Sequence, residues 1–256
     1  MITEHSTAFP RHVLPKAEVF KARFAFQNAQ NVIIVSRALR TAIESFGIHG
    51  SFQIIANTVD QDIFSPMKSL RPLGSPIRLL FVNRISEEKG LSDLISALSI
   101  VNNLRNDWQL DVVGDGPKKS ECEQLCSSLN LENKIIFHGY MPKHKIPEFM
   151  RQADIFILPS HIETFSVVTA EALSCGLPAL ATRCGGPEEF ITPEVGRIVP
   201  VAEPKKLAKE LSWMMENLPR FSREKISEYA KKNFSLEVIG SQYHSLYHAL
   251  LNNNKH

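Results

Sequence analysis

The sequence predicts an α/β protein organised around a doubly wound parallel sheet. From Ile77 onward, short runs of β-branched and aliphatic residues alternate with helix-length amphipathic segments. This alternation is typical of parallel strands that helices cover on both faces. The chain has 256 residues, of which 43% are hydrophobic, and that length is enough to bury a sizeable core. A globular fold with six strands in its larger part is therefore expected.

The strands of this larger part are short apolar runs, and the segments between them repeat apolar residues at helical spacing. The expected strands are 77–82, 109–113, 134–137, 154–158, 178–182 and 197–199. One helix is expected from the repeat of Leu91, Leu94, Ile95, Leu98 and Val101, and a second around Leu125 and Leu129. Further helices are expected over 145–151, 204–217, 222–233 and 235–251.

A smaller α/β segment precedes this sheet. Two strands are expected at 31–35 and 52–56, with helices at about 15–29 and 37–46. Residues 57–76 contain several prolines and little apolar periodicity, which indicates a linker. The expected division of the chain is a first part with its linker over 1–68, the sheet domain over 69–218 and C-terminal helices over 219–256.

Composition excludes several classes of protein. A net charge of +2 without a basic stripe does not favour nucleic-acid binding. No apolar run approaches the roughly 20 residues of a spanning helix, and the first residues lack the layout of a signal peptide, so a cytoplasmic location is expected.

The spacing of Cys122, Cys126, Cys175 and Cys184 fits neither a zinc site nor a disulfide framework. Reduced thiols and no bound metal are expected, with His244 and His248 as surface residues.

Charged and glycine residues follow four of the six expected strands. Arg84 and Lys89 come after the first strand, the turn 114–117 after the second, the stretch 160–166 after the fourth and the stretch 183–189 after the fifth. In an open parallel sheet, ligands bind beyond the carboxyl ends of the strands, near the point where the strand order reverses. These residues are therefore expected to meet at one edge of the sheet.

This set of residues suits a diphosphate flanked by sugars. Arg84 and Lys89 can neutralise phosphate oxygens. The alternative is that Arg84 and Lys89 are exposed residues beside Glu87 and Glu88. The position of Arg84 and Lys89 just after a strand favours the phosphate role over this alternative. Main-chain amides at a helix start and in a glycine turn can add neutral donors. The candidates for these amides are Phe165, Ser166, Val167, Gly185 and Gly186.

Two acids stand near the fourth strand, and the second lies within an apolar stripe. Glu171 is flanked by Val168, Ala172 and Leu173, and a buried carboxylate needs a partner. We expect Glu171 to accept hydrogen bonds from ribose hydroxyls and Glu163 to hold the hydroxyls of a transferred sugar, because a vicinal diol offers two donors to the two oxygens of a carboxylate. If the segment between the two acids is helical, a rise of about 1.5 Å per residue places them roughly 10 Å apart along the helix axis. The alternative for Glu171 is pairing with a basic residue, although none stands three or four positions away.

Several segments together resemble one known family. The stretch "ETFSVVTAE" resembles the E-x7-E motif of retaining glycosyltransferases of the GT-B fold, specifically family 4. The stretches "NTVDQDIFSP", "VNRISEEKG", "VVGDGP" and "GGPEEFI" are similar to other motifs of that family, in the same order. Together the matches cover about residues 31 to 245. The order of five motifs is far more specific than any one of them.

The resemblance implies transfer of a hexose from a nucleotide diphosphate sugar to a glycan, lipid or cell-envelope acceptor, with retention of configuration and no essential metal. Arg84 and Lys89 would stabilise the leaving diphosphate. The resemblance also makes Gly114 a candidate for donor binding, although an ordinary tight turn between strand and helix explains its stretch better. His5 stands where that family has a histidine at the end of a strand, close to the reacting sugar; the alternative is an incidental polar residue near a terminus.

This sequence departs from the family pattern at four glycines. The replacements are Thr58, Asn83, Thr164 and Ser166. The larger departure is that only 56 residues precede the linker, whereas the resemblance implies an acceptor-side domain of full size. Residues 1–68 are therefore expected to be a remnant with exposed apolar strand surface.

Three interpretations remain open from the sequence. The first is a metal-independent glycosyltransferase; the second is a sugar-nucleotide-binding module or fragment without independent activity, whose missing N-terminal half a partner would supply. A dinucleotide-dependent oxidoreductase ranks last, because no G-x-G-x-x-G follows an expected strand. Lys16, Lys21 and Arg23 are candidates for peripheral contact with anionic lipid, against the simpler interpretation of a solvated helix face.

Overall fold

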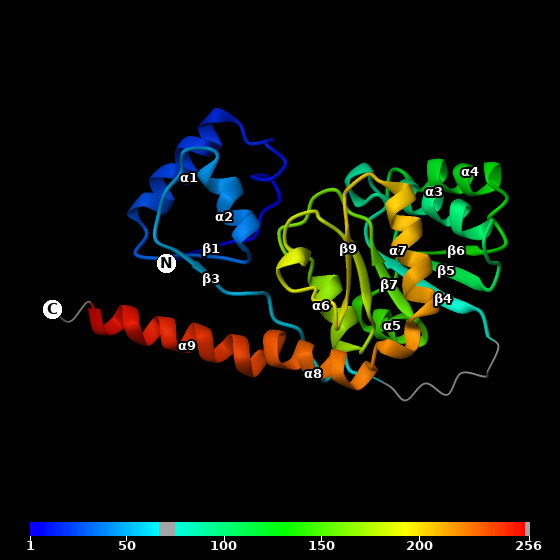
Figure 1. Cartoon of the computed structure of the whole chain (residues 1–256). Helices are drawn as coiled ribbons and strands as arrows, with labels where there is room; N and C mark the ends of the chain where they lie inside the picture. Colours follow the sequence, from blue (N-terminus) through cyan, green and yellow to red (C-terminus); the bar gives the residue numbers. More distant parts are fainter. Residues whose placement is uncertain (67–74, 254–256) are drawn as a thin grey trace.

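The computed structural model describes residues 1–66 and 75–253, and its strands form two separate parallel sheets (Figure 1). The strands are β1 (Ile2–Glu4), β2 (Val32–Ile34), β3 (Phe52–Ile54), β4 (Ile77–Val82), β5 (Trp108–Val113), β6 (Ile135–Gly139), β7 (Ile155–Leu158), β8 (Ala179–Thr182) and β9 (Gly196–Val199). The α-helices are α1 (Lys16–Asn28), α2 (Arg37–Glu44), α3 (Leu91–Asn102), α4 (Lys119–Ser128), α5 (Ile146–Gln152), α6 (Val167–Ser174), α7 (Pro204–Glu216), α8 (Arg223–Phe234) and α9 (Leu236–Asn253). Short 3₁₀ helices are η1 (Glu87–Lys89), η2 (Lys143–Lys145), η3 (Pro187–Glu189) and η4 (Leu218–Arg220).

The larger sheet has the order β6-β5-β4-β7-β8-β9, and all its pairs are parallel. The chain runs outward from β4 through β5 and β6, then returns to the other side of β4 and continues through β7, β8 and β9. The strand order therefore reverses between β4 and β7, where an open α/β sheet binds its ligands. The six predicted strands are all present, and the predicted doubly wound α/β fold is confirmed.

Helices cover both faces of this sheet because successive strand residues point to opposite sides. In β4, Leu79 and Phe81 pack into the core beneath α3, α4 and α7, whereas Leu80 packs into the core shared with α6 and α8. All three side chains are at most 1% exposed. A continuous apolar run such as "IRLLFV" is what a strand buried on both faces requires.

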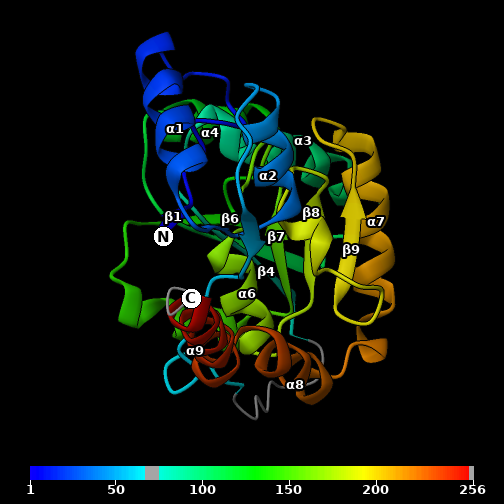
Figure 2. The same ribbon diagram turned by 90° about the vertical axis from the view of Figure 1, so that its left-hand side faces the viewer.

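The smaller sheet has the order β1-β2-β3, and β1 was not among the strands predicted from apolar runs. The expectation of exposed strand surface here is wrong for both faces of β2. Val32 and Ile34 are buried in the core that includes Phe26 of α1. Helix α9 runs back along the small sheet (Figure 1), and Ile33 and Ile55 are buried against Ile239 and Leu246 of that helix. Figure 2 shows the same arrangement from the side. Helix α9 thus completes the core on this face of the small sheet.

The predicted linker is partly structured, because Val59 forms a parallel bridge with Ser235 at the start of α9. The predicted boundary between residues 68 and 69 lies outside the described residues. No helix in the two described ranges is both long and apolar enough to cross a bilayer.

Candidate functional site

A cavity of about 650 Å³ lies where the strand order reverses. Residues after β4 and β5, the segment after β6 and the first turns of α6 form its walls. The lining residues are Val82, Asn83, Arg84, Val113, Gly114, Asp115, Tyr140, Met141, Lys143, Ile146, Val167, Val168 and Glu171. The walls combine apolar side chains with two basic residues, Arg84 and Lys143, and two acidic residues, Asp115 and Glu171, as is typical of a small-molecule site.

Arg84 enters this cavity from the loop that follows β4. Its main-chain amide donates to the side chain of the preceding Asn83 (N to Oδ1, 2.9 Å). Gly114, after β5, has a φ of +142°, and a Cβ there would lie 1.9 Å from the carbonyl oxygen of Asn83. The two loops therefore pack backbone against backbone, and only glycine fits at position 114. The glycine serves this close approach and also lines the cavity.

Glu171 lies on α6 and is 8% exposed. Its Oε1 lies 3.2 Å from Nζ of Lys143, which comes from η2. Burial raises the pKa of Glu171, and the nearby Lys143 ammonium opposes that rise in part. The pairing that the sequence offered as an alternative is thus present, but its lysine comes from a different element rather than from the same helix.

Glu163 and Lys89 form a second acid–base pair, away from this cavity. The distance from Lys89 Nζ to Glu163 Oε1 is 2.7 Å, and Ser160 Oγ also donates to Oε1 at 3.0 Å. The two side chains are only 16% and 10% exposed. Neither is among the described residues that line the 650 Å³ cavity. The predicted donor residues therefore fall into two neighbouring groups rather than one.

The segment between the two acids is less helical than its sequence predicts. Helix α6 begins at Val167, so helical rise applies only from there to Glu171, a distance of about 6 Å along the axis. Ser166, the residue before the helix, has a φ of +71°, and its Oγ lies 2.8 Å from Thr169 Oγ1. A serine in the left-handed region is strained, and it stands where the family pattern has a glycine.

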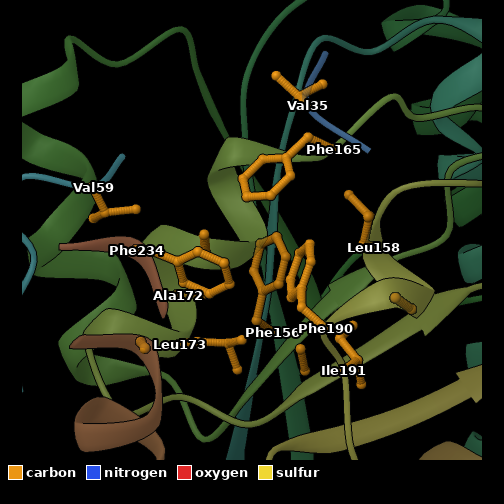
Figure 3. Packing of buried hydrophobic residues seen from close by; sticks show 14 of the residues in the cluster. Val35, Val59, Phe156, Leu158, Phe165, Ala172, Leu173, Phe190, Ile191 and Phe234 are labelled. Atoms are coloured by element: carbon orange, nitrogen blue, oxygen red, sulfur yellow. The ribbon is translucent and has the colours of Figure 1, made fainter. Parts of the chain in front are cut away.

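Phe165 points into the protein core instead of into the cavity. Its ring packs against Phe190 and Phe234, with centroid distances of 5.1 and 5.7 Å (Figure 3). The side chain is 4% exposed. Phe165 therefore anchors the loop, and any contact with a ligand would have to come from its backbone.

The glycine turn after β8 packs tightly against this loop. Glu163 and Gly185 form a parallel bridge, and added Cβ atoms at Gly185 and Gly186 would lie 2.4 Å from Glu163 O and 2.3 Å from Phe165 Cα. The prediction that the amides of Gly185 and Gly186 are available as donors to a phosphate is wrong, because both donate to groups within the protein. The Gly185 amide donates to Glu188 Oε2 (2.8 Å) and the Gly186 amide to Glu163 O (3.1 Å). These internal bonds position the loop.

His5 follows β1 and lies beside the same loop. Its carbonyl oxygen accepts a hydrogen bond from Thr164 Oγ1 (3.2 Å), whereas its side chain is exposed. Glu189 makes a second connection, because its carboxylate accepts from the amides of Arg37 and Ala38 at the start of α2 (3.0 and 2.9 Å). The small sheet therefore rests against the loops that carry Glu163 and Gly185.

Sequence reasoning missed the segment that follows β6. Tyr140, Met141 and Lys143 all line the cavity, yet functional residues were predicted only after the first, second, fourth and fifth strands and not after the third. The same rule that identified Arg84, applied to this strand, would have found them.

The described residues contain no group of three or more His, Cys, Asp or Glu side chains that could hold a metal ion. Asp60 accepts a hydrogen bond from the amide of Asp62 (3.0 Å), as in a local turn. The four cysteines are buried and free, and burial raises the pKa of Cys175 and Cys184 to about 12.

Solved structures share this fold. The chain superposes on sucrose-phosphate synthase from Thermosynechococcus elongatus with a TM-score of 0.85 at 23% identity, over 98% of this chain and 68% of that one. The Anabaena protein HepE, solved in complex with UDP and glucose, gives a TM-score of 0.84 at 24% identity, over 96% of this chain and 70% of that one. The predicted GT-B class is confirmed by these neighbours.

Sequence relatives agree with the structures. N-acetyl-alpha-D-glucosaminyl L-malate synthase of Bacillus anthracis is 27% identical over 91% of this chain and 63% of its own length. A GDP-mannose-dependent alpha-(1-6)-phosphatidylinositol monomannoside mannosyltransferase of Mycolicibacterium smegmatis is 29% identical over 73% of this chain and 53% of its own length. The chain thus matches roughly half to two thirds of each of these relatives. The family described as "Glycosyl transferases group 1" matches residues 65–233, well over half of the sequence, and the chain belongs to that family.

Proposed function

We propose that this protein transfers a hexose from a nucleoside diphosphate sugar to a glycan, lipid or cell-envelope acceptor, with retention of configuration and without a metal. The observation that carries the proposal is that Arg84 and Glu171, from separate elements, line one cavity at the reversal of strand order. A guanidinium suits a diphosphate, and a carboxylate suits a ribose diol. HepE was solved in complex with UDP, and the name of the mycobacterial relative mentions GDP-mannose. Both support a nucleotide-linked donor.

In this proposal, side chains stabilise the negative charge that develops on the leaving diphosphate. Arg84 would contact it in the cavity, and Lys89 would assist from the adjacent loop. Positive groups already in place at the developing charge stabilise the transition state more than the bound substrate. The pair with Glu163 fixes the position of the Lys89 ammonium, while Glu163 and His5 are proposed to face the transferred sugar.

The acceptor part of the proposal rests on the relatives. Their names include an L-malate product and a phosphatidylinositol mannoside, so the family members matched here act on acceptors of different kinds. The name of the mycobacterial relative supports a lipid among the proposed acceptors.

Thermal unfolding in the presence of UDP, GDP and ADP tests donor binding. A ligand that binds only the folded protein raises its melting temperature, and saturation at 100 times Kd stabilises by about 2.7 kcal/mol. We expect one diphosphate to produce this shift and Glu171→Ala to abolish it. Glu148→Ala is the matched control, because Glu148 is an exposed acid on α5 whose partner is Lys145. An unchanged shift in Glu171→Ala would refute the ribose role.

Turnover with the corresponding sugar nucleotide tests transfer. Arg84→Ala should lower kcat by about 10²–10³-fold, as for loss of one group that stabilises transition-state charge. The anomeric configuration of the product, read by NMR, reports retention. Nucleotide binding without a glycosidic product would instead favour a donor-binding module that does not transfer sugar alone.

A further inference from the structure

The ion pair between Lys143 and Glu171 is unequal in burial. The Lys143 side chain is 70% exposed and the Glu171 side chain 10% exposed, with 3.2 Å between Nζ and Oε1. Glu171 is fixed within α6, among buried neighbours such as Ala170 and Ala172. Lys143 reaches it across the cavity from η2, passing over the ring of Phe64 at 5.7 Å from the centroid.

This inequality determines which partner can move. A buried carboxylate held by its helix has little freedom, whereas an exposed lysine on a four-carbon stem samples many rotamers at small free-energy differences. An exposed ion pair is worth only a fraction of 1 kcal/mol up to about 1 kcal/mol. The ammonium can therefore leave Glu171 for water when another donor arrives.

The ligand in the proposed function would bring such donors. A ribose presents two neighbouring hydroxyls, and both would donate to the carboxylate of Glu171. The Lys143 ammonium already lies at hydrogen-bonding distance from Oε1. A diol that uses both carboxylate oxygens must compete with the ammonium for that oxygen.

We propose that Lys143 occupies the ribose position of the cavity in the unliganded protein and is displaced from Glu171 when a nucleoside diphosphate binds. This inference rests on the proposed function, because it assumes that Glu171 receives the ribose. Lys143 thereby lowers the affinity for ligands that carry the diol, and it keeps the buried carboxylate partnered while the cavity holds no nucleotide.

Calorimetric titrations at pH 8 test this competition. The ligands are UDP, GDP and ADP and the 2′,3′-dideoxy analogue of whichever binds. Removal of a competitor of this strength, as in Lys143→Ala, should tighten binding of the ribonucleotide about two- to fivefold. Binding of the dideoxy analogue, which has no diol to compete, should stay unchanged. Lys145→Ala is the matched control, since Lys145 lies on the same turn but pairs with Glu148 outside the cavity.

Other outcomes overturn the inference in distinguishable ways. Weaker binding of both nucleotides to Lys143→Ala would mean that Lys143 contacts the diphosphate. Unchanged binding of both would mean that no competition takes place. In either case the proposed function stands, provided that wild type prefers the ribonucleotide to its dideoxy analogue. Equal binding of those two ligands to wild type, or binding of none of the three diphosphates, would overturn the ribose role and the inference with it.

Discussion

Glu163 and Glu171 are equally buried, at 8% exposure each, yet their surroundings differ. Glu163 is held by Lys89, which is itself mostly buried, and by Ser160. Glu171 has an exposed lysine as its ionic partner and opens onto the 650 Å³ cavity. One carboxylate is therefore part of a closed network and the other is open to a ligand.

This difference gives the two carboxylates, which lie close together in the sequence, different tasks. The network around Glu163 is built from the loop after β7, the turn after β8 and the end of η1, so it organises three loops at once. The surroundings of Glu171 are apolar, with a single ammonium that water can solvate. A site that must hold its geometry and still accept a ligand gains from this division, because reorganisation is confined to the exposed lysine.

The largest expected effect follows from breaking the closed pair. Lys89→Ala should lower the free energy of unfolding by about 3–5 kcal/mol, because it leaves a buried carboxylate without its counter-ion. Lys143→Ala, which removes the partner of the other acid, should lower it by less than about 1 kcal/mol, because that pair is exposed on the lysine side. Urea unfolding of both variants checks this comparison. Equal losses in the two variants would contradict the difference between the sites.

A smaller effect is expected from crowding the loop that holds Glu163. Gly186→Ala places a Cβ 2.3 Å from Phe165 Cα and 2.5 Å from Thr164 O, so the backbone must shift. We expect a loss of about 1–3 kcal/mol in the free energy of unfolding, measured by urea unfolding. Gly240→Ala is the control, because nothing lies within 4 Å of a Cβ there and the position is within α9. That variant should be stabilised by up to about 1 kcal/mol, and a similar loss in both would show that the contact at Gly186 is unimportant.

The fold could be predicted because it depends on local patterns. The run 77–82 coincides with β4, and the other predicted strands of the large sheet differ from the structure by at most two residues at either end. Burial on both faces makes such runs continuously apolar. Strand β1 was missed since "ITE" has too little apolar character to stand out.

A site residue could be predicted from the sequence only where its position after a single strand was enough to place it. Arg84 was placed in the cavity by its position after β4 alone. The partner of Glu171 could not be found from helical spacing, because Lys143 approaches from the loop after β6. Likewise, the use of the Gly185 and Gly186 amides depends on the bridge to Glu163, a tertiary contact that no local pattern shows.

The smallest expected effect concerns the open carboxylate and is a dependence on pH. Burial raises the pKa of Glu171 above its ordinary value of 4.5, so the folded protein binds this proton more tightly than the unfolded chain does. Glu171 therefore lowers stability progressively as pH rises from about 4.5 through the folded-state pKa, above which its contribution is constant.

Glu171→Gln removes this titration, so the stability of the variant relative to wild type should increase over the same pH range and then level off. Urea unfolding of both proteins at several pH values measures the difference. Glu148→Gln, at an exposed acid, should show no such trend. A relative stability of Glu171→Gln that falls with rising pH would mean that the Lys143 ammonium outweighs burial, and the carboxylate would then belong to a closed pair like that of Glu163.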